Sequence, residues 1–560
     1  MPDLLLLLQK NKVTFFNNLV KNFLSYKRFV KSNKLLFCDS KKDNYNKKSK
    51  VLIEFNAFHN AHLPISYLSN TLAKINKSEI NAFYNYSIIK TPLKNSLLNE
   101  VRWKIGNFFS IKNFGIYRSF GVKNIFKPSI SPQNKIKSKL YLKKIYSKLK
   151  KKEDISKIRF DTILVGDLIY DTYLKFYTEP TIEIKDKRFY NLLRDFLSLY
   201  FFWKSYLKKN KVIAVIGVHT AYSYGLILRM AINKNIPAYA TSSRFIYSLS
   251  KKMPYMHGHF KIFKKTFNKF NYSLKKKAFN LAKKKLELRF KGIGGAKVDL
   301  ISSEKSSFRS KKFQRKIIPS KKIKILITPH DFFDATHIYG STLFVDFYEW
   351  LKFLGKLSET TDYDWYIKNR PNFNGKFKIY QSHTNNIIKE IINEFPKLKL
   401  LPNDYSHHQI IKEKIDFVLT CYGSVGVEYP YFGIPVINAS KNNPHINYNF
   451  NFHPKTKNEY KNYLTNLSKI KKKKLSFSKK DIYEYYFMRN IYTDKNWLIE
   501  DLPKMIKYVG GYDGQWTNKF YDYWLDNLTD QKHEQVIKKI QNFINSKNNY
   551  INVSHTNKIL

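Results

Sequence analysis

The residues best suited to chemistry lie in the stretch Asp416–Ser440, around two glycines and a carboxylate. This stretch begins with a short apolar run that is typical of a buried parallel strand. Gly423 and Gly426 then allow a sharp turn and keep side chains away from a bound molecule. Ser424 is a good N-cap for the predicted helix, whose first turn would present unpaired N–H groups to a phosphate. Glu428, one helical turn later, is placed to hydrogen-bond a ribose.

The pattern GSxGxE…GxPVI in this stretch resembles the nucleotide-binding signature of GT-B glycosyltransferases, in their C-terminal domain. The resemblance is strongest to enzymes of bacterial capsule and surface-polysaccharide synthesis. It implies that the Gly/Ser turn, with Ser424 and Gly426, binds the diphosphate of a nucleotide sugar, and that Glu428 binds its ribose. The alternative is a plain strand–helix unit whose glycines serve only packing.

Three further positions belong to the donor site that this resemblance implies. Lys368 and Pro371 match a Lys-x-x-Pro type motif that follows a strand at the domain cleft in the family. Arg370 stands where that family often has histidine, and either cation can face a diphosphate. His445, in the loop after the Gly-Pro turn, is a candidate contact to the donor base or sugar. An ordinary loop histidine is the alternative interpretation.

A glycosyl acceptor must lose a hydroxyl proton, so a general base is expected near the donor. His219 directly follows the buried strand predicted at Val212–Val218, and ligands of open α/β sheets bind beyond the carboxyl ends of strands. Asp171 lies in the segment GDLIYDTYL, which also resembles the N-terminal domain of the surface-polysaccharide proteins. We predict His219 and Asp171 as catalytic candidates, and we expect Asp167 near the same cleft. A core histidine and a salt-bridged or capping aspartate are the alternatives.

The motif HDFFDATH follows the strand predicted at Lys324–Thr328. His330 and Asp331 are therefore expected at the cleft, in contact with substrate, unless this is an ordinary loop. Histidine and aspartate can also bind metal ions. No second cluster has the spacing of metal ligands, so no metal is expected, and no cofactor beyond the nucleotide sugar, which is a substrate.

Apolar strands alternate with amphipathic helices along most of the chain, which predicts parallel sheets. We expect two Rossmann-like, doubly wound domains facing a cleft, the GT-B type of α/β fold. The predicted divisions are a basic helical arm (1–48), an acceptor-side domain (49–305), a nucleotide donor domain (306–485) and a helical C-terminal tail (486–560). The arm is expected either to lie on a membrane surface or to pack on the first domain.

The charge of the 560-residue chain is strongly positive, with 101 Lys+Arg against 42 Asp+Glu and a formal net charge of +59. This excess fits an anionic membrane or acidic glycan, a nucleic acid, or lysines spread over solvated faces. No nucleic-acid module signature occurs, so nucleic acid is not an expected partner. Two cysteines give no disulfide framework. No apolar stretch reaches about 20 residues, so no transmembrane helix is expected. The expected location is cytoplasmic, peripheral to the inner face of the bacterial plasma membrane.

The predicted function is glycosyl transfer from a nucleotide-activated sugar to a surface polysaccharide or lipid-linked glycan. Transfer of a polyol phosphate from a CDP-linked donor and epimerisation of a nucleotide sugar are alternatives on the same fold. A non-catalytic basic protein that binds glycan or nucleic acid is the alternative from another class.

Overall fold

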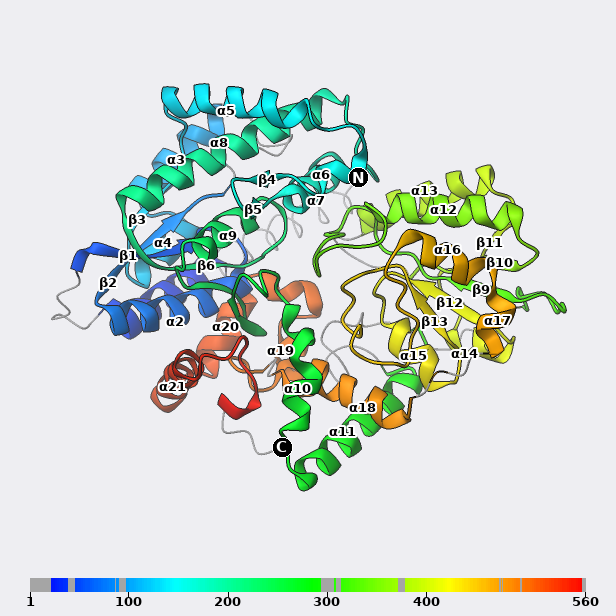
Figure 1. Cartoon of the computed structure of the whole chain (residues 1–560). Coiled ribbons are helices and arrows are strands. Elements are labelled where there is room, and N and C mark those ends of the chain that lie inside the picture. The colour runs from blue at the N-terminus through cyan, green and yellow to red at the C-terminus, as the bar shows by residue number, and fades with distance from the viewer. Residues whose placement is uncertain are drawn as a thin grey trace, which may run out of the picture.

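Two α/β domains lie side by side in the computed structural model, with a group of helices beneath them (Figure 1). The structure describes residues 22–38, 46–85, 87–89, 97–293, 307–308, 314–370, 378–472, 475, 477–493 and 496–555. Each domain is built on one mainly parallel sheet covered by helices on both faces. The chain therefore has two Rossmann-like, doubly wound domains of the GT-B type, as predicted.

The sheet of the first domain has the strand order β3-β2-β1-β6-β7-β8, parallel except for β8, which pairs antiparallel with β7. Its strands are β1 (Asn46–Glu54), β2 (Ser78–Phe83), β3 (Val122–Phe126), β6 (Lys211–Gly217), β7 (Ala238–Ser242) and β8 (Phe245–Leu249). Its helices are α2 (His59–Asn76), α3 (Leu97–Phe108), α4 (Asn113–Ser119), α5 (Pro132–Tyr146), α6 (Lys152–Ile155), α7 (Gly166–Tyr177), α8 (Lys187–Lys209), η1 (Tyr222–Tyr224) and α9 (Gly225–Asn233). Both faces of β1 are buried, which explains its continuous apolar run.

The sheet of the second domain has the order β11-β10-β9-β12-β13, and all its strands are parallel. Its strands are β9 (Lys324–Ile327), β10 (Asp364–Ile367), β11 (Leu398–Leu400), β12 (Phe417–Thr420) and β13 (Val436–Asn438). Its helices are α12 (Phe347–Thr360), α13 (Lys378–Glu394), α14 (His407–Lys412), α15 (Val425–Tyr431), α16 (Lys457–Thr465) and α17 (Leu467–Lys472). Ile325 and Ile327 join one core while Leu326 joins another on the opposite face, as the two-residue period of a strand requires.

The remaining helices connect the domains and return the chain to the first one. They are η2 (Gly258–Ile262), α10 (Phe263–Asn268), α11 (Tyr272–Phe290), α18 (Lys479–Phe487), η5 (Met488–Tyr492), α19 (Leu502–Tyr508), η6 (Tyr512–Trp516), α20 (Lys519–Asp526), α21 (Asp530–Ser546) and η7 (Val553–His555). Trp524 and Phe543 of this tail lie in the core of the first domain, and α21 packs on α2 (Figure 1). Burial of these aromatic rings anchors the tail there.

The helix at residues 22–38 packs on the first domain. Phe29 is buried and its ring stacks on Tyr521, with centroids 4.0 Å apart. Ser25 donates a hydrogen bond to Asp522, 2.8 Å away. For these residues the packed alternative therefore holds. Residues 1–21, including the apolar run Leu4–Leu8, lie outside the described part of the chain.

The segment Thr162–Asp167 differs from its predicted structure. Its apolar run predicts a strand that ends at Gly166-Asp167. In the structure only Ile163–Leu164 (β5) is extended, and it pairs with Arg159–Phe160 (β4) in a separate antiparallel hairpin. Helix α7 then begins at Gly166, where a Cβ atom would lie 2.0 Å from the carbonyl oxygen of Ile155. This close approach of two backbones turns the chain into a helix, so Asp167 is not at the end of a sheet strand.

No helix within the described ranges is both long and apolar enough to cross a membrane.

Candidate active site between the two domains

The two sheets direct their carboxyl ends to one interdomain cavity. His219 follows β6 of the first domain, His330 and Asp331 follow β9 of the second, and Tyr422 follows β12. All of them border a cavity of about 180 Å³, which is lined by His219, His330, Asp331, Asp334, Ala335, Ile338, Tyr339, Phe347, Arg370 and Tyr422. Both groups of strands end at the point where the strand order of their sheet reverses, the usual ligand site in such folds.

The glycine turn lies beside this cavity but differs in detail from the expected phosphate cradle. Helix α15 begins at Val425, one residue after Ser424, as predicted. Ser424 takes the predicted N-cap position, but it is exposed and its side chain makes no capping hydrogen bond. The N–H of Gly426 donates to Gly423, and the N–H groups of Val427 and Glu428 donate to Ser424. These three donors are therefore used within the turn, and the seven-residue helix supplies only a short dipole.

Gly426 is required for packing against His445. A Cβ atom at Gly426 would lie 2.5 Å from His445 Nε2, and Asn451 joins the two by donating to the Gly426 carbonyl at 2.7 Å. The Asn451 amide also lies 3.1 Å from His445 Nδ1. Burial holds the pKa of His445 well below its usual range, so the ring is neutral. Predicted as a donor contact, His445 is buried behind the glycine turn.

Glu428 is held by an arginine that the sequence interpretation missed. Its carboxylate accepts a hydrogen bond from Arg289 Nε at 2.7 Å, and a second Arg289 nitrogen contacts the same oxygen. Arg289 also donates to Ser424 Oγ at 3.4 Å. Arg289 lies in the last turn of the lysine-rich helix α11. A single arginine among so many basic residues could not be recognised from the sequence as the partner of Glu428.

Lys368 and Arg370 both follow β10, but their surroundings differ. Lys368 is 3% exposed, and its ammonium donates to the carbonyl oxygens of Asn369 and Asn403. Burial lowers its pKa to about 8, against the opposing attraction of Glu428. Arg370 lines the cavity and pairs with Asp331 at 3.3 Å. Pro371 lies outside the described residues.

His219 lines the cavity but is not arranged as a general base. Its Nδ1 accepts a hydrogen bond from the backbone N–H of Ala221 at 3.0 Å, so the proton of the neutral ring is on Nε2. Burial lowers the pKa of His219 to about 4, which keeps the ring neutral at neutral pH. A base needs a free lone pair toward its substrate. In this arrangement His219 presents an N–H donor to the cavity rather than a free lone pair.

His330 is likewise fixed as a neutral ring. Its Nε2 accepts from the backbone N–H of Tyr422 at 3.3 Å, which places the ring proton on Nδ1. Burial, reinforced by the charge of Arg370, lowers the pKa of His330 to about 3. The ring also lies against the Tyr422 ring, with centroids 4.5 Å apart. His330 therefore shapes the cavity wall where β9 and β12 end.

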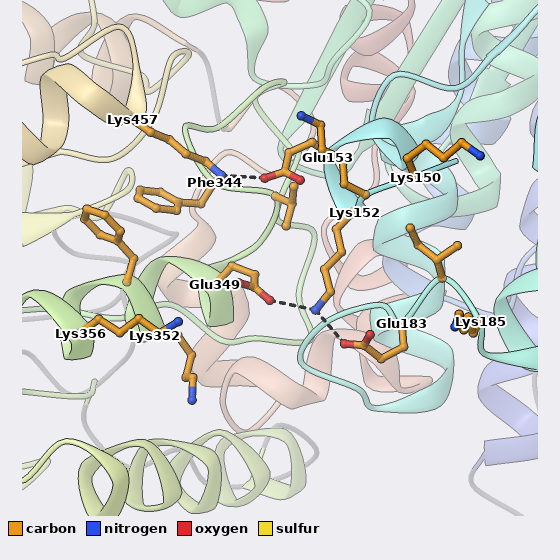
Figure 2. Close-up of a pocket in the computed structure, with 14 residues that line it drawn as sticks. Lys150, Lys152, Glu153, Glu183, Lys185, Phe344, Glu349, Lys352, Lys356 and Lys457 are labelled. Carbon is orange, nitrogen blue, oxygen red and sulfur yellow. Dashed lines mark hydrogen bonds and ion pairs between the residues drawn. The ribbon is translucent and has the colours of Figure 1, made fainter. Parts of the chain in front are cut away.

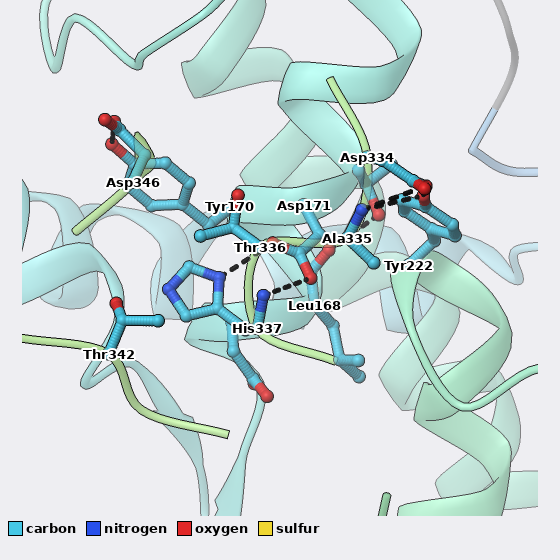
Figure 3. A network of polar contacts seen from close by, with 12 residues as sticks. Leu168, Tyr170, Asp171, Tyr222, Asp334, Ala335, Thr336, His337, Thr342 and Asp346 are labelled. Atoms are coloured by element: carbon cyan, nitrogen blue, oxygen red, sulfur yellow. Dashed lines mark hydrogen bonds and ion pairs between the residues drawn. The ribbon is translucent and has the colours of Figure 1, made fainter. Parts of the chain in front are cut away.

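Asp171 and Asp167 are structural, which corrects two further predictions. Asp171 is buried and accepts two hydrogen bonds from His337, the ring contact being 2.7 Å (Figure 3). Burial disfavours the charged His337 ring, but the carboxylate of Asp171 outweighs it and raises the pKa of His337. Asp167 forms a bidentate ion pair with Arg229, both contacts being 2.6 Å, in the first domain. Neither carboxylate lines the cavity.

The Asp171–His337 pair is part of a polar network that joins the domains. Tyr170 of α7 donates to Asp346 at 2.6 Å, and Tyr222 of the first domain donates to Asp334 at 2.8 Å (Figure 3). Both bonds cross the interface, the first buried and the second partly exposed, and together they hold the domains in a defined orientation. Among the described residues no group of acidic, histidine and cysteine side chains has the arrangement of a metal site.

The sequence matches no protein-family profile and no curated protein. Among solved structures, a β-Kdo 2,4 transferase, KpsC of Thermosulfurimonas dismutans, aligns over 49% of this chain and 79% of its own, with 11% identity and a TM-score of 0.30. The UDP-GlcNAc 2-epimerase of Neisseria meningitidis, bound to UDP-GlcNAc, aligns over 81% of this chain and 100% of its own, with 11% identity and a TM-score of 0.21. MurG of Acinetobacter baumannii aligns over 88% of this chain and 99% of its own, with 10% identity and a TM-score of 0.18. Because these TM-scores are so low, the alignments carry no argument. The assignment to a GT-B type fold depends on the strand orders of the two sheets and on the cavity that both domains line.

Proposed function

We propose that this protein transfers a glycosyl group from a nucleotide-activated sugar to a glycan acceptor in the interdomain cavity. The observation that carries the proposal is that both sheets end at this one cavity, beside the Gly423–Ser424 turn. Glu428 and Lys368 interact electrostatically at the adjoining edge of the second domain. A nucleotide bound along this edge would place its sugar in the cavity.

The cavity supplies two groups for a departing diphosphate. The guanidinium of Arg370, whose side chain is 41% exposed, is a permanent cation with several donors. His219 offers a neutral Nε2–H from the opposite domain. Fixed donors and cations aimed at developing negative charge stabilise a transition state without reorganisation. Arg370 and His219 are therefore the proposed leaving-group contacts.

Two carboxylates on the cavity wall, Asp331 and Asp334, replace Asp171 as candidates for the base. Asp331 accepts from the Phe333 N–H at 3.1 Å and from Thr384 at 3.3 Å, so its orientation is fixed. Substitution of the true base by asparagine should lower kcat by about 10²–10⁴-fold and leave donor binding intact. If Asp331→Asn and Asp334→Asn both keep full activity, neither residue is the base.

The nucleotide site is tested by the melting temperature in the presence of UDP, GDP, CDP and CMP, because a ligand of the native state raises it. A shift with one nucleotide that is absent from Glu428→Gln supports the proposal. Incubation with the matching nucleotide sugar then separates the reactions: glycosyl transfer and polyol-phosphate transfer need an acceptor, but an epimerase acts on its nucleotide sugar alone. A melting temperature that none of the four nucleotides raises would contradict the nucleotide-binding proposal.

The turn between α3 and α4 supports a second proposal, that the protein docks on an anionic membrane. Phe108 and Phe109 are 83% and 66% exposed, and Ile111 beside them is also exposed. Ser110 and Lys112 have positive φ angles of 54° and 53°, a constrained turn that presents these apolar side chains. Exposed aromatic residues among basic ones suit the interface of anionic lipids.

The membrane proposal is tested by sedimentation with vesicles. The wild type should bind phosphatidylglycerol-containing vesicles, lose that binding in high salt and bind phosphatidylcholine vesicles poorly. The double variant Phe108→Ser, Phe109→Ser should bind less at unchanged melting temperature, since both rings are exposed. As the matched control, Tyr272→Ser removes another exposed aromatic ring, on α11, and should bind as the wild type. Equal binding to both vesicle types would reject the charge-dependent docking.

A further inference from the structure

A second and larger cavity lies between the domains, separate from the central one (Figure 2). Its volume is about 620 Å³. The first domain contributes Lys150, Lys151, Lys152, Glu153, Glu183, Ile184 and Lys185, and the second contributes Phe344, Val345, Glu349, Lys352, Phe353, Lys356 and Lys457. We call it the lysine pocket, because seven of these residues are lysines. Both domains are needed to form it.

The lysine pocket keeps an excess of positive charge after its internal ion pairs are counted. Its three glutamates are all paired: Glu153 with Lys457 at 2.8 Å, and Glu183 and Glu349 with Lys152 at 2.8 and 2.9 Å (Figure 2). Within the described part of the chain the other four lysines besides Lys152, Lys352 and Lys457 make no ion pair, namely Lys150, Lys151, Lys185 and Lys356. Like charges held together from two domains repel each other unless an anion lies between them.

The pocket also offers apolar rings beside the cations. Phe344 and Phe353 lie 5.0 Å apart with their planes tilted by 48°, and the Lys457 ammonium lies over the Phe344 ring at 5.1 Å. Aromatic faces pack against the C–H faces of sugar rings, whereas the lysines suit carboxylates or phosphates. The two features together match an anionic carbohydrate better than an isolated inorganic ion.

The position of the pocket relates it to the central cavity. Both adjoin the start of α12: Phe347 lines the central cavity, while Val345 and Glu349 line the lysine pocket. Asp346 between them caps α12 by accepting from the Glu349 N–H at 2.7 Å. The same Asp346 is bound by Tyr170 across the interface. A chain molecule lying in the lysine pocket therefore ends close to the wall of the central cavity.

We propose that the lysine pocket binds the acceptor and that the acceptor is a glycan carrying several carboxylate or phosphate groups. This inference rests on the glycosyl transfer proposed above, because it assigns the second substrate of that reaction. The anionic chain would lie across the lysines and extend its terminal sugar to the central cavity. The charge of the pocket then selects acidic acceptors over neutral ones of equal length.

Binding of defined probes to the full-length protein tests the pocket. Tetragalacturonate supplies carboxylates on sugar rings, tripolyphosphate supplies phosphates without rings, and maltotetraose is the neutral control. Calorimetry should detect an anionic probe but not maltotetraose. The triple variant Lys150→Gln, Lys185→Gln, Lys356→Gln should weaken that binding by about tenfold or more, from the loss of three charge contacts of modest strength each.

A matched variant separates the pocket from general surface charge. Lys135→Gln, Lys139→Gln and Lys143→Gln together remove the same charge from exposed positions of α5 and should bind the probe as the wild type. The probe that binds best distinguishes carboxylate from phosphate acceptors. Equal weakening in both triple variants, or equally tight binding of maltotetraose, would overturn the inference.

The melting-temperature shift with nucleotide keeps this test apart from the proposed function. The pocket variant should keep the full nucleotide shift, because Glu428 and Arg289 are not among the pocket residues. A nucleotide shift without anion binding overturns the acceptor inference alone. Anion binding in the pocket without any nucleotide shift overturns the transferase proposal, and the acceptor role falls with it.

Discussion

The two domains use the same strand order around their central strands, yet their switch points differ. In the first domain β1 ends at Glu54, whose buried carboxylate accepts from the Val218 N–H at 2.9 Å. The protein therefore satisfies the strand end with its own side chain. In the second domain the corresponding position, between β9 and β12, holds His330 and Tyr422 on the wall of the cavity. At the first switch point Glu54 bonds the protein itself and only the β6 side, through His219, reaches the cavity, whereas residues after both β9 and β12 line it in the second domain.

The same division separates the aspartates of the two domains. Asp167 in the first domain forms a buried ion pair with Arg229, whereas Asp331 in the second lines the cavity. A carboxylate near a sheet end is therefore not enough to indicate chemistry. Whether the carboxylate is structural or faces a ligand is decided by how many hydrogen-bond and ion-pair partners the fold supplies to it.

The largest expected effect concerns the buried pair of the first domain. Asp167→Ala leaves the guanidinium of Arg229 buried without its carboxylate, which should cost about 3–5 kcal/mol of unfolding free energy. Urea unfolding followed by circular dichroism measures this. Asp331→Ala, the matched change in the second domain, should cost less than about 1 kcal/mol, since its partner Arg370 is half exposed. Equal destabilisation would remove the distinction between the domains.

The second effect is the pH dependence caused by Glu54. Burial raises its pKa from 4.5 to about 7, so folding favours the protonated acid. The unfolded chain ionises first, and stability is lost as the pH rises from about 4.5 to about 7. The loss should reach about 3 kcal/mol, because one pKa unit corresponds to about 1.4 kcal/mol.

The variant Glu54→Gln checks this assignment, since its amide oxygen can still accept from Val218. Unfolding free energies of wild type and variant, measured between pH 5 and pH 8, should converge at the acidic end and separate at the basic end. A variant whose profile runs parallel to that of the wild type would show that Glu54 does not cause the dependence.

The third effect concerns the second domain and its ligand. Glu428→Gln should weaken nucleotide binding by about 1–3 kcal/mol, from the loss of a charged hydrogen bond. Calorimetry with the nucleotide chosen by melting-temperature screening measures it. Glu413→Gln is a suitable control, because Glu413 is bonded to Tyr405 and Gln409, whereas Glu428 is bonded to Arg289 at the glycine turn. Unchanged affinity in folded Glu428→Gln protein would remove Glu428 from the site.

The smallest effect distinguishes a working helix cap from the exposed serine of the glycine turn. Thr456 accepts from the Glu459 N–H at 3.1 Å and caps α16, so Thr456→Ala should cost about 1 kcal/mol. Ser424 makes no such bond, and Ser424→Ala should change unfolding free energy by less than about 0.5 kcal/mol. A larger cost at Ser424 than at Thr456 would contradict this comparison of the two helix starts.

Much of the fold was predictable from local patterns. The apolar runs at β6, β9, β10 and β12 identified buried strands, and Gly433, whose φ is 78°, is of the residue type that commonly follows the end of a helix, as it does after α15. Two regions were predicted wrongly or not at all: Thr162–Asp167 became a hairpin and helix start, and β8 was not foreseen. Both depend on partners elsewhere in the chain rather than on the local run of residues.

The sequence by itself determined the α/β class, the pairing of a glycine turn with Glu428, and the presence of His219, His330 and Asp331 at strand ends, because strand and turn signals act over a few residues. Only the tertiary structure decided what these groups do. Asp171 meets His337 from 166 residues away, and Glu428 meets Arg289 from 139 away. Burial and hydrogen-bond partners set the proton positions and charges of these side chains. Such partners are brought together only by folding, within one domain for His330 and across the interface for Asp171.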